Sequence, residues 1–275
     1  MPTTYTHDRF GTDVLAAMPE DDRIRISDDL DLFMIGLQGP DILFYYKPFV
    51  KNKIVALGHF LHDQPGRYFF GNAARRLFSG SCPPGEAELS YICGCLAHYA
   101  LDVVCHPDIV AFEQSSGVTH AEIEGEFDRY LLVTDGYDPV RAVLTGNFHP
   151  SGRAAKAIAP FYKGVTERGI LKSLDGFISF NKIVRAPGKA KRAFLNGALR
   201  AVGKYDSFHG HIINLAPNPL CEESNRILMG RYEEALPVAV DLIHRFLDTK
   251  GRDVNTDDFY DYDFLGIPRD GQEGK

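Results

Sequence analysis

Small and apolar residues fill one stretch of the chain almost completely. From Leu89 to Leu101 the sequence contains no Asp, Glu, Lys or Arg. A helix that is apolar on all sides is buried among other elements. This stretch is too short for a membrane span, and ionisable residues follow at its end. The pattern therefore predicts a buried central helix.

The other strong periodicities are helical too. Apolar residues recur at i, i+3, i+4 and i+7 within 28–37, and a long amphipathic pattern covers 222–247. Thr6 or Asp8 can cap a helix that runs to about Met18. The sequence shows neither an internal repeat nor a convincing alternating strand pattern. We therefore expect an all-α fold.

We expect the chain to divide into two units. Residues 1–250 form a single multi-helix domain around the central helix, and residues 251–275 form a polar, acidic C-terminal tail that packs loosely.

Composition narrows the class of protein. Hydrophobic residues make up 44% of the 275 residues, which suits a globular protein with a substantial core. The net charge of −7 argues against a stable nucleic-acid partner. The five cysteines are expected to be reduced, and the N-terminus does not have the pattern of a signal peptide. With no transmembrane segment expected, these features favour a cytoplasmic protein whose oligomeric state the sequence leaves open.

Three ionisable residues at the end of the central helix carry the first chemical signal. His98, Asp102 and His106 are spaced i, i+4 and i+8, so consecutive members lie one above the other on one helix face. Buried imidazole and carboxylate groups are costly unless something compensates them, and a zinc ion compensates both. Pro107 disfavours helical geometry at His106, so the helix is expected to end there, with Asp102 bridging two ions.

A second helix offers another pair at the same spacing. Thr119 and Glu122 have the form of a capping box, which places His120 and Glu124 one turn apart near the helix start. The alternative is a buried salt bridge on the central helix and a solvated first turn on this one. Two such pairs together favour a metal cluster.

Four residues upstream are further candidate ligands. His7 by itself is typical of a surface histidine at a helix end. Asp41 follows Gly-Pro and is either a cap or a metal carboxylate facing the central helix. His59 and His62 are spaced i, i+3, so either both face one site or one orients the other.

The second half of the chain carries weaker signals. Residues 182–204 are basic, and the preferred interpretation is a solvated face with an exposed loop. The alternative is a contact surface for phosphate or an anionic lipid head group. His209 and His211 have no carboxylate at ligand spacing, so we interpret them as structural.

The ordered histidine and carboxylate residues resemble those of the zinc-dependent phospholipase C family. That family includes secreted bacterial phosphatidylcholine-hydrolysing enzymes, and fungal single-strand-specific nucleases are similar to it. The chain looks most like the intracellular bacterial branch. The segments that carry the resemblance are GLQGPD (36–41), LGHFLH (57–62), HYALDVVCHP (98–107) and HAEIEGEFDRYLL (120–132).

The resemblance implies a first zinc held by His98, Asp102, Asp41 and one histidine of the 59/62 pair. His62 fits the intracellular branch, whereas His59 matches the secreted enzymes, so both stay candidates.

The resemblance further implies a second zinc held by His106, His120 and Glu124. His7, Asp102 and the N-terminal residue would hold a third. The secreted enzymes use an N-terminal Trp there, and this chain contains no Trp, so the number of ions is two with a third left open.

The function implied is a metal-dependent phosphoric ester hydrolase of phospholipase C type. Asp41 would accept a proton from the attacking water, and the substrate would be a phosphate ester such as a phospholipid. The alternatives are a nuclease or phosphomonoesterase on the same fold, and a non-catalytic metal-dependent binding module.

Overall fold

The computed structural model describes residues 4–27, 29–48, 50–80 and 85–269. Within these ranges the chain is helical and contains no strand, which confirms the predicted all-α class. The α-helices are α1 (Thr4–Ala17), α2 (Glu20–Ser27), α3 (Leu30–Gly36), α4 (Lys53–His62), α5 (Gly66–Phe78), α6 (Glu86–Ser116), α7 (His120–Thr134), α8 (Gly152–Ile158), α9 (Glu167–Val184), α10 (Lys189–Ala201), α11 (Tyr205–Phe208) and α12 (Glu222–Thr249). The 3-10 turns are η1 (Gly39–Tyr45), η2 (Ala159–Phe161), η3 (His209–His211), η4 (Pro219–Cys221), η5 (Asp253–Asn255) and η6 (Asp258–Asp261).

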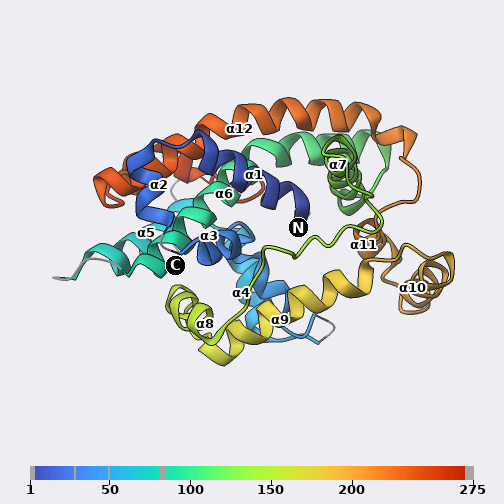
Figure 1. The fold of residues 1–275 in the computed structure, drawn as a ribbon, viewed down its shortest axis with the longest axis horizontal. Coiled ribbons are helices and arrows are strands. Elements are labelled where there is room, and N and C mark those ends of the chain that lie inside the picture. The colour runs from blue at the N-terminus through green and yellow to red at the C-terminus, as the bar shows by residue number, and fades with distance from the viewer. Residues whose placement is uncertain (1–3, 28, 49, 81–84, 270–275) are drawn as a thin grey trace.

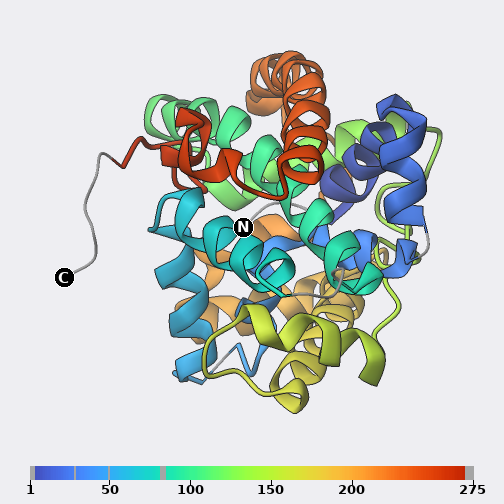
Figure 2. The same ribbon diagram turned by 90° about the vertical axis from the view of Figure 1, so that its left-hand side faces the viewer.

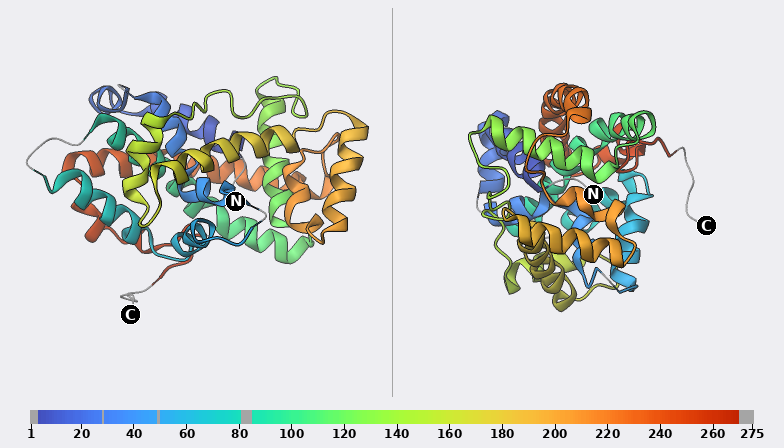
Figure 3. Two further views of the ribbon diagram at one scale, coloured as in Figure 1. Left: turned by 90° about the horizontal axis from the view of Figure 1, so that it is seen from below. Right: turned by 90° about the vertical axis from the view of Figure 1, so that its right-hand side faces the viewer.

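The helices form two layers around one core. The long helices α6 and α12 lie side by side in one layer, with α1 and α7 against them (Figure 1). Helices α4, α8 and α9 make up the other layer, which Figure 2 shows from the side. Helices α10 and α11 lie at one end of the molecule, and the view from below in Figure 3 shows the same position.

Helix α6 is the predicted buried helix. Every residue from Leu89 to Leu101 is buried. Helix α3 approaches it so closely that a β-carbon on Gly36 would lie 2.2 Å from the Tyr91 carbonyl oxygen, and one on Gly94 would lie 2.2 Å from the Phe33 carbonyl oxygen. Only glycine allows this backbone contact, and it brings the segment after α3 onto His98.

Helix α6 is also long and apolar enough to cross a membrane by length and composition. In the protein, however, 94% of its most apolar window is buried. It is therefore the core helix of a globular domain.

The expected helix end at His106 is wrong, because α6 continues through Pro107 to Ser116. A proline has no N–H to donate to the carbonyl one turn earlier, here that of Val103. Gly266 packs against this carbonyl and the Pro107 ring, at a φ of 69° that favours glycine. Surrounding packing therefore keeps the helix regular, and His106 stays on the face that carries His98 and Asp102.

The expectation of a loosely packed C-terminal tail is also wrong for its described part, 251–269. Val254, Tyr260 and Phe264 are buried in the core, and Asp263 is fully buried. The Asp263 carboxylate accepts hydrogen bonds from the backbone N–H groups of Leu265 and Ile267, at 2.8 and 2.9 Å. The polar residues of this segment thus hold a turn in place rather than solvate a tail.

Candidate metal centre

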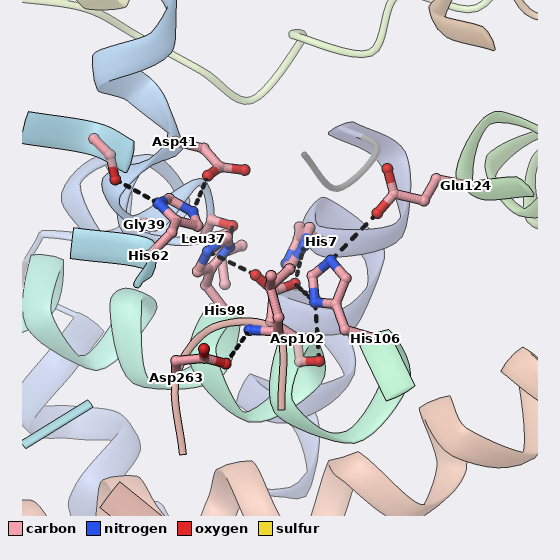
Figure 4. A network of polar contacts seen from close by, with 12 residues as sticks. His7, Leu37, Gly39, Asp41, His62, His98, Asp102, His106, Glu124 and Asp263 are labelled. Atoms are coloured by element: carbon pink, nitrogen blue, oxygen red, sulfur yellow. Dashed lines mark hydrogen bonds and ion pairs between the residues drawn. The ribbon is translucent and has the colours of Figure 1, made fainter. Parts of the chain in front are cut away.

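The predicted histidine and carboxylate residues, apart from His59, meet inside the protein, and Figure 4 shows most of them. Asp102 lies at the middle of the group. One of its oxygens is 3.2 Å from His98 Nε2, and the other is 3.3 Å from His7 Nε2 and 3.8 Å from His106 Nδ1. His7, which the sequence alone favours as a surface residue, is only 1% exposed.

A second group adjoins the first at His98. Asp41, the third residue of η1, lies 2.6 Å from His62 Nε2. One ligand atom each from Asp41, His62 and His98 lies within 4.8 Å of the others. His98 thus belongs to this group and to the group around Asp102.

The third group joins α6 to α7. Glu124 Oε1 lies 3.5 Å from His106 Nε2 and 3.1 Å from His120 Nε2. Two residues on α7 and one on α6 therefore face one another, as the paired i, i+4 spacings predicted. His120 is the most accessible of the three, with 24% of its side chain exposed.

The protein fixes the orientation of three of these imidazole rings. His62 Nδ1 lies 2.8 Å from the Gly58 carbonyl oxygen, and His106 Nδ1 lies 3.0 Å from the Asp102 carbonyl oxygen. His98 Nδ1 lies 3.2 Å from the Leu37 carbonyl oxygen. A carbonyl can only accept, so each Nδ1 carries the proton and each Nε2 presents its lone pair to the group.

The positions of the polar atoms at the centre suit coordination of a metal better than direct hydrogen bonding between the side chains. The Nε2 atoms of His7, His62, His98 and His106 are buried and find no hydrogen-bond partner among the residues that the structure describes. Several lie within ion-pair distance of a carboxylate without the angles of a hydrogen bond. Ligands about 2.0–2.1 Å from a tetrahedral zinc are separated by about 3.3 Å, which is the spacing found around Asp102. Histidine nitrogens and carboxylate oxygens are also the donors zinc uses.

The electrostatics leave His98 and two carboxylates in the protonation states that a metal needs. Burial lowers the pKa of His98 to about 4, so the ring is neutral at pH 7. Burial alone would raise the pKa of Asp102, but His98 and His106 outweigh it and hold the pKa below its usual value. His62 overcomes burial in the same way and lowers the pKa of Asp41. For His62 and His106 burial is outweighed by Asp41 and Asp102, which raise the pKa of each ring, so a metal would displace a proton there.

The structure distinguishes between His59 and His62. His59 is exposed and its ring packs on Phe44, with 4.8 Å between ring centroids. His59 belongs to none of the three groups found among the described residues. The two histidines are three residues apart on α4, so their spacing alone allows either one to face the site. The position of η1, which carries Asp41, determines that His62 is the one in contact.

The predicted capping box at the start of α7 does not form. The Thr119 side chain makes no capping hydrogen bond, and Glu113 Oε1 accepts from the His120 N–H instead, at 2.9 Å. Glu122 lies 2.9 Å from His209 Nε2. The helix nevertheless begins at His120, so His120 and Glu124 share the predicted face.

Asp128 is a supporting residue that the sequence analysis missed. Its carboxylate accepts hydrogen bonds from the Thr6 backbone N–H at 2.7 Å and the Tyr5 backbone N–H at 3.1 Å. It thus caps α1 from α7, in place of the expected Thr6 or Asp8 cap, and so positions His7. A signal was present, because His120, Glu124 and Asp128 follow the same i, i+4, i+8 spacing as the residues on α6.

Gly39 and Phe264 shape the walls of the centre. Gly39 has a φ of 48°, and a β-carbon there would lie 2.3 Å from the His98 ring. Only glycine therefore lets η1 close over His98. The Phe264 ring lies 5.0 Å from the His62 ring and 5.8 Å from the His98 ring, which brings the C-terminal segment onto the centre.

An apolar cavity lies between the segment after α7, the end of α9 and η3. Val140, Val143, Leu144 and Ile213 are among its lining residues, and so is His211. Burial lowers the pKa of His211 to about 4, and the charges of Glu124 and His120 act on the same ring. The turn η3, which contributes His211 to the cavity, packs on α7, the helix that carries His120 and Glu124.

Comparison with known proteins identifies a family whose model matches this chain. The model of the family described as zinc dependent phospholipase C matches residues 6–169, more than half of the chain. That range contains every candidate histidine and carboxylate ligand, from His7 to Glu124. No curated protein and no solved structure matches the chain.

Proposed function

Since the chain belongs to the zinc-dependent phospholipase C family, we propose that it hydrolyses phosphodiesters, phospholipids among them, with zinc bound at the centre described above. The observation that carries the proposal is the excess of buried histidines around the carboxylates. The Nδ1 atoms of His62, His98 and His106 lie against backbone carbonyls, while their Nε2 atoms face Asp41, Asp102 and Glu124 in turn. Asp102 alone lies within 3.8 Å of His7, His98 and His106. A salt bridge needs one histidine per carboxylate, whereas this arrangement supplies three.

The residues divide between two principal ions. Asp41, His62, His98 and Asp102 would hold one, and His106, His120 and Glu124 would hold the other. His7 with Asp102 offers a third position. Zinc in these positions supplies Lewis-acid chemistry, which polarises a phosphoryl group and lowers the pKa of water.

Asp41 is the residue we assign as general base. Its lowered pKa keeps the carboxylate ionised at neutral pH, ready to accept a proton. Water oxygen bonds to phosphorus, its proton passes to Asp41, and the bond from phosphorus to the alcohol oxygen breaks. The departing alkoxide takes a proton from solvent, so the products are a phosphomonoester and an alcohol. From a phospholipid, the alcohol is diacylglycerol.

The apolar cavity lined by His211, Val143 and Leu144 favours a substrate with a hydrocarbon part. A cytoplasmic location is part of the proposal, supported by four buried free thiols at Cys93, Cys95, Cys105 and Cys221.

The test is a panel of substrates with zinc-loaded protein and with protein stripped by EDTA. A chromogenic phosphorylcholine diester and mixed phospholipid micelles should both be hydrolysed, only with zinc. Hydrolysis of single-stranded DNA alone would instead identify a nuclease, and turnover of a phosphomonoester alone would identify a phosphatase. Full zinc occupancy without turnover of any substrate would contradict an enzymatic role and favour a binding module.

A further inference from the structure

Helix α10 leaves one apolar stripe in solvent, whereas its Leu195 and Leu199 are half-buried. No residue of this 13-residue helix is fully buried. Phe194 is 73% exposed, and Val202 just after the helix is 67% exposed. Phe194 belongs to an outer stripe with Ala190, Ala198 and Ala201, all exposed at helical spacing. An amphipathic helix normally turns such a stripe towards the core.

The same segment concentrates positive charge in an acidic chain. Between positions 182 and 205 there is no Asp or Glu, although the chain as a whole carries a net charge of −7. Seven cations lie there, and none forms an ion pair with a carboxylate in the part of the chain that the structure describes: Lys182, Arg185, Lys189, Lys191, Arg192, Arg200 and Lys204.

Two of these cations fasten α10 to the protein. Lys191 Nζ donates to the carbonyl oxygens of Lys182 and Arg185, at 2.9 and 2.8 Å. Arg192 donates to the Ile213 carbonyl oxygen at 2.6 Å and to the Ala186 carbonyl oxygen at 3.1 Å. The helix is therefore held in place with its outer stripe in solvent, and the other cations have no carboxylate partner in the described parts of the chain.

The position of α10 connects it to the metal centre. Helix α10 leads through α11 to η3, which packs on the first turn of α7 (Figure 1). The contact is close, since a β-carbon on Gly125 would lie 2.2 Å from the Gly210 carbonyl oxygen. Lys182 and Arg185 line the apolar cavity together with Val143 and with His211 of η3.

We propose that this basic surface, comprising the outer stripe of α10, Val202 and the exposed cations Lys182, Arg185, Lys189, Arg200 and Lys204, docks the protein on an anionic membrane. A cationic helix with an exposed aromatic residue lies in the plane of a lipid interface, where its apolar face enters the acyl region and its cations meet anionic head groups. Each cation near such a surface strengthens partitioning about fivefold.

The exposed apolar stripe favours a membrane over a nucleic acid, because a phosphate backbone offers cations a partner but leaves Phe194 in water. The inference rests on the proposed function for its purpose, which is to bring the metal centre to phospholipid. Vesicle binding nevertheless requires no turnover, so experiments can contradict the docking surface and the proposed hydrolase function independently.

The experiment is sedimentation of zinc-loaded full-length protein with vesicles of phosphatidylcholine, alone or with one third phosphatidylglycerol. Wild-type protein should bind the anionic vesicles and lose binding as salt is raised, because exposed charges are screened. Lys189→Glu with Lys204→Glu should weaken binding by about 25-fold or more. Phe194→Ser should weaken it about tenfold through lost apolar burial.

Matched controls lie elsewhere on the surface. Lys156→Glu with Lys163→Glu makes the same charge change at two exposed sites on α8 and the loop after η2. Ile24→Ser removes an apolar side chain that is 57% exposed on α2. Both controls should bind anionic vesicles like the wild type. All variants should hydrolyse the soluble chromogenic diester at the wild-type rate.

Four results would overturn the docking surface. These are no binding of wild-type protein to anionic vesicles, equal loss in the control variants, binding of single-stranded DNA through Lys189 and Lys204 without vesicle binding, and a Phe194-dependent dimer without vesicle binding. Vesicle binding by a protein that leaves the soluble diester intact would support the docking surface and remove the proposed hydrolase function instead.

Discussion

Helices α6 and α10 depart from ordinary burial in opposite ways, because α6 buries polar side chains and α10 exposes apolar ones. Helix α6 buries His98, Asp102 and His106 in the core, whereas α10 leaves Phe194 in solvent. Each arrangement costs free energy unless a further component compensates it. We propose that a metal ion compensates for this cost at α6 and that a membrane surface does so at α10. The comparison teaches that departures from ordinary burial are the features of this protein that point to a bound ligand or surface.

The largest expected effect comes from Asp102→Asn, which keeps the volume and removes the charge at the middle of the centre. Zinc content should fall, and diester hydrolysis should drop roughly 100-fold or more, because several kcal/mol of metal-dependent stabilisation is lost. Elemental analysis and the chromogenic assay measure the two together. A fall in stability with wild-type zinc content would mean that Asp102 only forms a buried salt bridge.

His62 and His59 provide a matched pair one helical turn apart. His62→Ala should reduce diester hydrolysis by roughly tenfold to 100-fold, because it removes a group 2.6 Å from Asp41. His59→Ala should leave hydrolysis unchanged, since His59 is exposed. Steady-state rates with added zinc measure both. The reverse result would mean that η1 packs differently against α4.

Asp128→Asn tests the residue that ties α1 to α7. The free energy of unfolding should fall by about 1–3 kcal/mol, since charged hydrogen bonds to the backbone of α1 are weakened. Urea unfolding in EDTA measures this without a zinc contribution. The control is Asp138→Asn, which affects an exposed pair with Arg141 at 3.4 Å and should change stability by less than about 0.5 kcal/mol. Equal effects of the two variants would contradict the role of Asp128 in tying α1 to α7.

The smallest expected effect is that of Phe194→Ala on stability. The free energy of unfolding should change by less than about 0.5 kcal/mol, because the side chain contributes little to the core. Phe177→Ala on α9 removes the same group from a position that is 1% exposed and should cost about 3–5 kcal/mol. A comparable cost at Phe194 would show that α10 packs its outer stripe, which contradicts the docking surface.

The predictable part of the centre comes from helical spacing. Residues four apart share a helix face, so His98 with Asp102 and His120 with Glu124 could be paired from the sequence. Spacing cannot show which faces meet. The choice of His62 over His59, and the pairing of Glu122 with His209, depend on contacts between distant segments. No local sequence pattern predicts these contacts.

Two errors have the same physical origin. Pro107 predicts a helix end, but packing against Gly266 keeps α6 regular. Residues after 250 look like a solvated tail because they are rich in Asp, yet Asp263 bonds the turn that presents Phe264. Tertiary contacts override local preference in both cases.

Zinc stoichiometry tests the central claim most directly. Purified protein is stripped with EDTA, reconstituted with zinc, freed of excess metal and measured by elemental analysis against protein concentration. The arrangement around Asp102 predicts at least two tightly bound zinc ions per chain. Less than one ion per chain would contradict the metal centre and leave a buried network of histidines and carboxylates.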